Sequence, residues 1–269
     1  IPCMKKNQSI NLLHGPIFKS LSLLAIPIMA TYFIQMAYNL VDMLWIGFLG
    51  SGAVASIGVS GNFMYLANGL VNMPKIGSQA LVGQSLGANN QEQTKNYIQA
   101  AFQSSLFFAL IYGIIIIVFQ KYLIQLFNLS DPAIIRDAQN YLWITCGFIV
   151  FSFVNQIFTG SLTAAGHSKS TFIATTTGLV LNLILDPVLI FVFNLRVIGA
   201  ALATILAQII VTLVFLYNAK NLDLFRNIRI LSKPELNHIS EILKIGFPSS
   251  VQSMLFTCIS MYIARLISS

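Results

Sequence analysis

The feature that most constrains this chain is a series of long apolar segments separated by short polar connections. A helix that crosses a bilayer needs about 20 mainly apolar residues. A lipid-exposed backbone also has to satisfy its own hydrogen bonds, as a helix does. The expected fold class is therefore an all-α integral membrane protein, a six-helix transmembrane bundle followed by a seventh helix. The predicted spans are residues 22–48, 56–84, 97–120, 138–160, 171–194 and 198–219, with the seventh helix from 243 to the end.

The composition also favours a membrane protein. The chain is 56% hydrophobic and only 9% charged, whereas a soluble domain carries about 25% charged residues. The formal net charge is +7, but the basic residues lie in connections between apolar segments. That placement suits the control of membrane topology, so no nucleic-acid partner is expected. The three cysteines are far apart in the sequence, which predicts packing roles rather than redox chemistry.

The basic residues are divided unequally between the two sides of the predicted bundle. Most of the 15 Lys and Arg residues fall on the side that holds the N-terminus. Because basic connections are retained in the cytoplasm, we predict a multi-pass protein of the cell (plasma) membrane with a cytoplasmic N-terminus. The residues on that side are Lys5, Lys6, Lys19, Lys95, Lys169, Lys220, Arg226, Arg229, Lys233 and Lys244.

The longest connection divides the chain into two structural units. Pro27 lies at the entry of the first predicted helix and Pro248 at the entry of the seventh, and a Gln residue follows each within an apolar run. This internal sequence similarity is typical of a transporter built from two repeated halves. We expect an N-terminal transmembrane lobe over 1–220, a cytoplasmic connection over 221–242, and over 243–269 the first helix of a truncated second lobe.

Two of the eight acidic residues, Asp42 and Asp186, lie deep within apolar segments. A carboxylate at the centre of a membrane helix costs about 2.5–3.5 kcal/mol on insertion scales, so we expect both to be functional. Polar stripes with helical spacing occur in three segments, and such faces are expected to line the bundle interior. The stripes are Thr31, Gln35, Tyr38 and Asp42; Thr171, Thr175, Gly178, Asn182 and Asp186; and Thr204, Gln208 and Thr212.

Asp42, Asp186 and Thr204 fall at one depth of the predicted bundle. At about 1.5 Å of rise per residue, all three lie about 9–12 Å below the outer surface, with Asn182 one turn below Asp186. Two carboxylates, an amide oxygen and a hydroxyl suit a hard monovalent cation or a shared proton. The alternative is structural: Asp186 stabilises a kink beside Pro187, and the polar stripes only hold helices together.

Four short motifs follow one another along the chain. They are Pro27 with Gln35, Tyr38-Asn39-Leu40-Val41-Asp42 and Gly47-x-x-Gly50; Gln84-Ser85-Leu86-Gly87-Ala88; Asn182-Leu183-Ile184-Leu185-Asp186-Pro187; and Gly199-Ala200-Ala201-Leu202-Ala203-Thr204. Together they resemble the motifs of the multidrug and toxic-compound extrusion (MATE) transporters, and the resemblance covers nearly the whole chain.

The resemblance implies two six-helix lobes around a central cavity that opens alternately to the two membrane faces. It implies export of cationic or amphipathic drug-like compounds by a protein surrounded by membrane lipids, with Na+ or H+ as the coupling ion, no other cofactor and no enzymatic activity. The implied ion or proton site, a candidate Na+ site, consists of Asp42, Asn182, Asp186 and Thr204. The implied substrate-cavity residues are Gln35, Tyr38 and Asn155.

Two departures from the family pattern affect this prediction. Most of the second lobe is missing, so transport is expected to need that lobe or another copy of the chain. Lys75 stands where the family has small or neutral residues; we expect its side chain to extend toward the membrane surface or to reach a partner in the cavity.

Three other functions are alternatives to export. One is a lipid or oligosaccharide flippase of related architecture, and another is a non-transporting fragment that folds as a lobe. The third is an intramembrane aspartyl protease with Asp42 and Asp186 as its acid–base pair. The protease is disfavoured because neither acidic residue lies in the Y-D or G-x-G-D motif of such enzymes.

Overall fold

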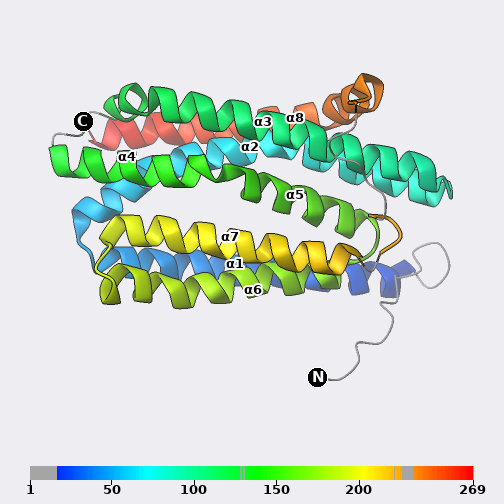
Figure 1. The fold of residues 1–269 in the computed structure, drawn as a ribbon, viewed down its shortest axis with the longest axis horizontal. Coiled ribbons are helices and arrows are strands. Elements are labelled where there is room, and N and C mark those ends of the chain that lie inside the picture. Colours follow the sequence, from blue (N-terminus) through cyan, green and yellow to red (C-terminus); the bar gives the residue numbers. More distant parts are fainter. Residues whose placement is uncertain (1–16, 128, 130, 221, 226–232, 269) are drawn as a thin grey trace.

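Figure 1 shows the computed structural model of the chain, which describes every residue except 1–16, 128, 130, 221, 226–232 and 269. All regular elements in this described part are helices, so the predicted all-α membrane bundle is confirmed. The helices are α1 (Ile17–Gly47), α2 (Ser51–Gly87), α3 (Gln91–Gln125), α4 (Pro132–Gly147), α5 (Ile149–Ala164), α6 (Ser168–Pro187), the short π-helix η1 (Val188–Val192), α7 (Arg196–Lys220) and α8 (Leu236–Ser268).

The helices have the length and composition that a bilayer requires. In the described part of the chain, five spans pass this test: α2, α3, α6 continued by η1, α7 and α8. The bent pair of α4 and α5 adds a sixth, and α1 is itself a helix of 31 residues. Large apolar side chains are exposed on the surface, among them Phe33 at 75% and Phe256 at 73%. So many exposed apolar side chains on long apolar helices fit contact with lipid or another apolar partner rather than water.

The fourth predicted span is divided into two helices. α4 and α5 meet at an angle of 50°, and the break lies at Phe148. Gly147, a poor helix former, directly precedes it. Asn155 and Gln156, which interrupt the apolar pattern in the sequence, lie inside the continuous helix α5. Their amide groups are satisfied by side chains of neighbouring helices, so they do not break the helix.

Pro187 changes the type of the helix that follows it. Because proline lacks a backbone N–H, it removes one bond of the α-helical ladder, and the next five residues form the π-helix η1. The Phe193 N–H donates to the Val188 carbonyl at 3.0 Å, which is the five-residue spacing of a π-helix. The first turn of α7 packs closely on this irregular segment: a Cβ atom at Gly199 would lie 2.7 Å from the Leu189 carbonyl oxygen.

The helices form two groups, as Figure 1 shows. α6 contacts both α1 and α7, and these three lie together in the lower part of the view. α2 contacts α3, α5 and, along much of its length, α8 in the upper part. The contacts of α4 and α5 with α7 join the two groups. The face between the groups is where the polar stripes of α1, α6 and α7 meet α5 and α2.

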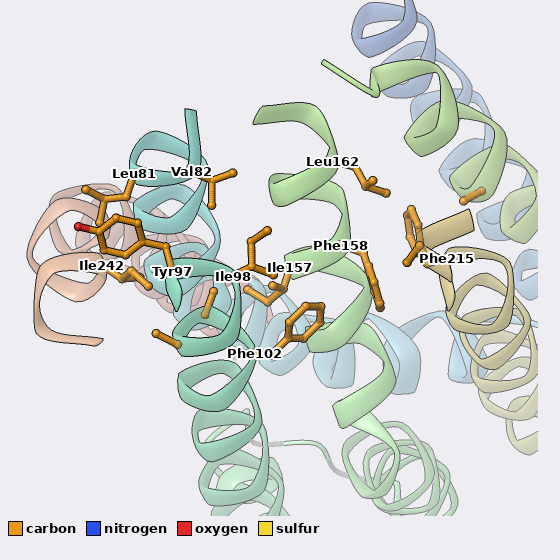
Figure 2. Close-up of a cluster of buried hydrophobic side chains, with 14 of the residues drawn as sticks. Leu81, Val82, Tyr97, Ile98, Phe102, Ile157, Phe158, Leu162, Phe215 and Ile242 are labelled. Carbon is orange, nitrogen blue, oxygen red and sulfur yellow. The ribbon is translucent and has the colours of Figure 1, made fainter. Parts of the chain in front are cut away.

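A large apolar core holds α2, α3, α5, α7 and α8 together (Figure 2). Phe158 of α5 lies near its centre and contacts the rings of Phe102 on α3 and Phe215 on α7, with centroid distances of 4.9 and 5.4 Å. Aromatic pairs of this kind contribute about 0.5–1.5 kcal/mol beyond the burial of their area. The core therefore fixes α5 between α3 and α7, which positions the polar residues on its other face.

α8 is longer than its apolar pattern predicts. The seventh helix was expected from 243, but α8 begins at Leu236 and runs without a break through the polar stretch before that point. Ile242 is fully buried, and the Tyr97 hydroxyl of α3 donates to Glu241 Oε2 at 2.6 Å. These tertiary contacts stabilise the first turns of α8, in a polar stretch assigned above to the cytoplasmic connection over 221–242, where the sequence also allows a short interfacial helix at Pro234–Glu241.

Candidate functional site

The carboxyl groups of Asp42 on α1 and Asp186 on α6 lie close enough for their charges to interact. Asp186 is fully buried, and its Oδ2 forms no hydrogen bond with the described residues. A buried carboxylate and a half-buried carboxylate beside it repel each other, and a bound proton or cation relieves that repulsion. The unsatisfied oxygen therefore fits a small hard cation or a proton.

A hydrogen-bonded chain leads from α1 to this pair. The Tyr38 hydroxyl donates to Asn182 Oδ1, and Asn182 Nδ2 donates to Asp186 Oδ1 at 3.2 Å. Asn182 is buried, with an exposed fraction of 3%. The chain fixes the orientation of the Asn182 amide and occupies one oxygen of Asp186. It leaves Oδ2 of Asp186 as the oxygen available to a cation or proton.

Beside this chain lies a cavity of about 370 Å³, which α1, α2, α5, α6 and α7 enclose. The predicted cavity residues Gln35, Tyr38 and Asn155 all line it. Tyr38 and Asn182 belong both to its lining and to the chain that ends at Asp186, so they connect the cavity with the carboxyl pair. The Ser and Thr residues of the lining are Thr31, Ser152, Thr159, Thr163, Ser168, Thr171, Thr175 and Thr204.

Thr204, the fourth residue of the predicted ion site, lies on α7 and lines the same cavity as Tyr38 and Asn182. Its hydroxyl donates to the Ala200 carbonyl at 3.0 Å. A hydroxyl that donates to the backbone keeps its lone pairs for a cation. The structure thus brings Asp42, Asp186 and Asn182 together directly, and places Thr204 with them through the shared cavity.

Asn155 joins α5 to α7. Its Nδ2 donates to the backbone carbonyl and to Oε1 of Gln208, at 3.0 and 2.7 Å, while its Oδ1 accepts from the Thr212 hydroxyl at 2.9 Å. All the polar groups of the amide are therefore engaged within the bundle. Asn155 lines the cavity, but its hydrogen bonds show that it also holds two helices in register.

Lys75 points into the bundle, so the expectation of a side chain extended toward the surface is wrong and the cavity alternative is right. It lines the cavity, and its Nζ donates to Gln156 Oε1 at 2.7 Å. Sequence reasoning missed Gln156 as a cavity residue. A polar residue next to Asn155 inside an apolar segment could have indicated a cavity position. Without knowledge of its partner Lys75 on α2, the same residue suggests an interruption of the helix.

Among the described residues, no three His, Cys, Asp or Glu side chains are grouped as ligands for a metal ion. The candidate site depends instead on two carboxyl groups supplemented by an amide and hydroxyls. This is a donor set for Na+ or a proton rather than for a transition metal, which prefers imidazole and thiolate ligands.

The protein-family model that matches this chain is described as MatE, and the match covers residues 27–188. The chain belongs to the MATE family. The matched region runs from Pro27 on α1 to the end of α6, and so includes both carboxylates and most of the cavity lining. As a MATE protein it is a multi-pass membrane protein.

Two curated relatives of this MATE chain are multidrug export proteins named MepA. One from Staphylococcus aureus (strain bovine RF122 / ET3-1) is 28% identical over 258 residues, and one from Staphylococcus saprophyticus is 27% identical over 267 residues. Each match covers 94% of this chain and 56% of the relative. The chain therefore spans about half the length of the curated relatives it matches.

Solved MATE structures have the same fold. A MATE protein crystallised with MaD3S has a TM-score of 0.86 at 24% identity, over 93% of this chain and 56% of that chain. An outward-facing multidrug resistance MATE transporter has a TM-score of 0.83 at 23% identity, over the same shares. At these identities the likeness establishes the fold and not the substrate.

Proposed function

We propose that this chain is the N-terminal, ion-coupling lobe of a multidrug efflux antiporter that exports cationic or amphipathic drug-like compounds by alternating access. The observation that carries the proposal is the proximity of the Asp42 and Asp186 carboxyl groups, linked through Asn182 and Tyr38 to a cavity of about 370 Å³. The coupling ion is Na+ or a proton. A second lobe, from another part of the protein or another copy of the chain, completes the transport pathway.

The coupling follows from the position of α1. α1 packs mainly on α6, and both the carboxyl pair and the Tyr38–Asn182 hydrogen bond lie in that contact. α1 also carries the cavity residue Gln35. Binding of a cation or proton removes repulsion across the α1–α6 contact, so it changes the position of α1 and with it the cavity wall. The membrane potential contributes about 2.3 kcal/mol per charge per 100 mV.

The orientation in the membrane is part of the proposal. The connections between α2 and α3 and between α5 and α6 lie at the same end of the bundle as the start of α1 (Figure 1). Lys95 and Lys169 follow these connections, while Lys121 and Arg136 lie near the opposite end. We place the more basic end, with the N-terminus, in the cytoplasm of the cell membrane.

Calorimetry on the purified chain tests the coupling site. We expect saturable Na+ binding, or proton release on a pH step, in the wild type and in a Glu92→Gln control. Glu92 is a matched acid exposed at the start of α3. The signal is expected to disappear in Asp42→Asn and Asp186→Asn. Binding that survives in both variants, or that is absent from the wild type, contradicts the site.

Transport is tested separately in proteoliposomes that contain the chain together with a complete second lobe. An imposed Na+ or pH gradient is expected to drive efflux of an amphipathic dye in the wild type, and Asp42→Asn is expected to abolish it. Gradient-driven efflux at the wild-type rate in Asp42→Asn would show that the carboxyl pair does not couple transport.

A further inference from the structure

Lys75 is a positive charge in the wall of the cavity. It lies on α2, and its Nζ donates to Gln156 Oε1 at 2.7 Å. No carboxylate forms an ion pair with it in the described part of the chain. An ammonium group has three donors, and one neutral amide oxygen satisfies only one of them. A charged residue at membrane depth without a counter-ion is a functional-site signal rather than a packing residue.

The side chain of Lys75 is held in place by its neighbours. At Gly160 on α5, a Cβ atom would lie 3.2 Å from both the Cγ atom and the carbonyl oxygen of Lys75. The aliphatic part of the lysine therefore packs directly on α5. Gln156 is fixed in turn, because its Nε2 donates to Asn68 Oδ1 at 3.3 Å, and Asn68 Nδ2 donates to the Met64 carbonyl at 3.0 Å. The Gln156 oxygen is thus directed at the ammonium group.

The acidic pair of the bundle does not neutralise this charge. Asp42 and Asp186 are absent from the cavity lining, whereas Lys75 belongs to it. The other lining residues are neutral, so Lys75 is the charge that a molecule in the cavity meets among the described residues. Gln79, one turn further along α2, lines the same cavity and has an amide that donates hydrogen bonds.

We propose that Lys75 and Gln79 form an anion subsite that binds the carboxylate of an amphipathic substrate. The apolar body of that substrate lies against Ile28, Leu179 and Val211, which line the cavity with them. The inference rests on the proposed export function and narrows its substrates. Within the cationic or amphipathic compounds of the proposed function, the cavity selects those with a carboxylate and disfavours those whose only charge is positive.

Binding of a matched pair of fluorescent probes tests this subsite without requiring transport. The probes are 11-(dansylamino)undecanoate and its neutral primary amide, titrated into the full chain in neutral phosphatidylcholine nanodiscs. In the wild type we expect the carboxylate probe to bind about tenfold or more tightly than the amide, the effect of one charge-assisted hydrogen bond. This comparison needs no substitution, so it stands even where a variant does not fold.

Three variants then assign the preference to Lys75. Lys75→Gln is expected to lower the affinity for the carboxylate probe about tenfold and to leave the amide probe unchanged. Lys75→Arg keeps the preference, and Lys121→Gln, an exposed lysine of α3, serves as the control. Equal affinity of the two probes in the wild type, or equal loss of both in Lys75→Gln, overturns the proposal.

A second titration, in a different lipid, distinguishes a substrate carboxylate from a lipid phosphate as the anion that binds. The titration is repeated in nanodiscs that contain phosphatidylglycerol, and unchanged binding of the carboxylate probe is expected. Loss of binding there would assign the subsite to a lipid phosphate and overturn the small-molecule assignment. This binding test does not depend on ion coupling. If the chain prefers the carboxylate probe but shows no gradient-driven efflux, the export function is refuted and the anion subsite stands. If efflux occurs but the two probes bind equally, the anion subsite is refuted and the export function stands.

Discussion

Gly77 on α2 lies so close to Ile242 on α8 that a Cβ atom at Gly77 would overlap the carbonyl oxygen of Ile242. Gly246 on α8 has the reciprocal relationship with the carbonyl oxygen of Met73 on α2. Small residues of this kind let the backbones of membrane helices approach closely. The two glycines fix the distance at which α8 docks on the lobe, and the Ser250 hydroxyl, which donates to the Gly69 carbonyl at 2.8 Å, adds a polar contact along the same seam.

The close approach predicts how alanine is tolerated at this seam. Gly77→Ala and Gly246→Ala force a backbone of the partner helix to move, and such overpacking costs about 1–3 kcal/mol. Thermal unfolding in detergent is expected to occur at lower temperature in each variant. Gly83→Ala on the same helix is the matched control, because its Cβ would meet no atom within 4 Å. If Gly77→Ala or Gly246→Ala is as stable as Gly83→Ala, α2 and α8 can move apart without a loss of stability, which contradicts the prediction.

The hydrogen bond from Tyr38 to Asn182 is expected to hold α1 on α6. Tyr38→Phe keeps the ring and removes the donor, so it is expected to lower the free energy of unfolding by about 0.5–1.5 kcal/mol. It is also expected to weaken cation or proton binding at Asp186, because the Asn182 amide is then free to turn. Tyr32→Phe, at an exposed cavity-lining position on α1, is the control. Indistinguishable unfolding and binding in the two variants would argue against the link.

The amide of Asn155 predicts a measurable coupling between α5 and α7. Single and double variants of Asn155→Ala and Thr212→Val form a double-mutant cycle. Polar contacts between membrane helices average about 0.6 kcal/mol and reach about 1.7 in such cycles. Because Asn155 Oδ1 accepts from the Thr212 hydroxyl at 2.9 Å, we expect a coupling free energy in that range from chemical unfolding. Additive effects of the two substitutions would mean that the hydrogen bond contributes no net stability.

His167, between α5 and α6, predicts a pH dependence outside the membrane-spanning segments. Burial lowers the pKa of His167 below its usual range. The unfolded chain therefore binds a proton more readily, so this group lowers the stability of the fold as the pH falls below about 6.5. We expect His167→Gln to unfold with a weaker dependence on pH between about pH 5 and 7, measured by thermal unfolding. Superimposable pH profiles for the variant and the wild type would exclude this role.

Much of the candidate site could be predicted because it depends on local spacing. Asp42 and Asp186 stand out in the sequence because carboxylates inside apolar segments are costly. Helical periodicity also placed Tyr38 with Asp42 and Asn182 with Asp186 on single faces. The contact between the α1 stripe and the α6 stripe does not follow from the spacing, since equal depth in the membrane does not determine which helices are neighbours. Their roles in ion coupling remain predictions for the experiments above.

The class of fold, the approximate spans and the polar faces follow from the sequence alone, because the length and periodicity of apolar runs are local properties that a bilayer constrains strongly. The start of α8 at Leu236 and the direction of the Lys75 side chain follow only from the folded arrangement of the helices. Both depend on contacts between residues that are distant in sequence. Gln156 turns Lys75 into the cavity, and the packing of α8 on α2 and α3 makes a polar segment helical. No window of the sequence contains both partners of such a contact.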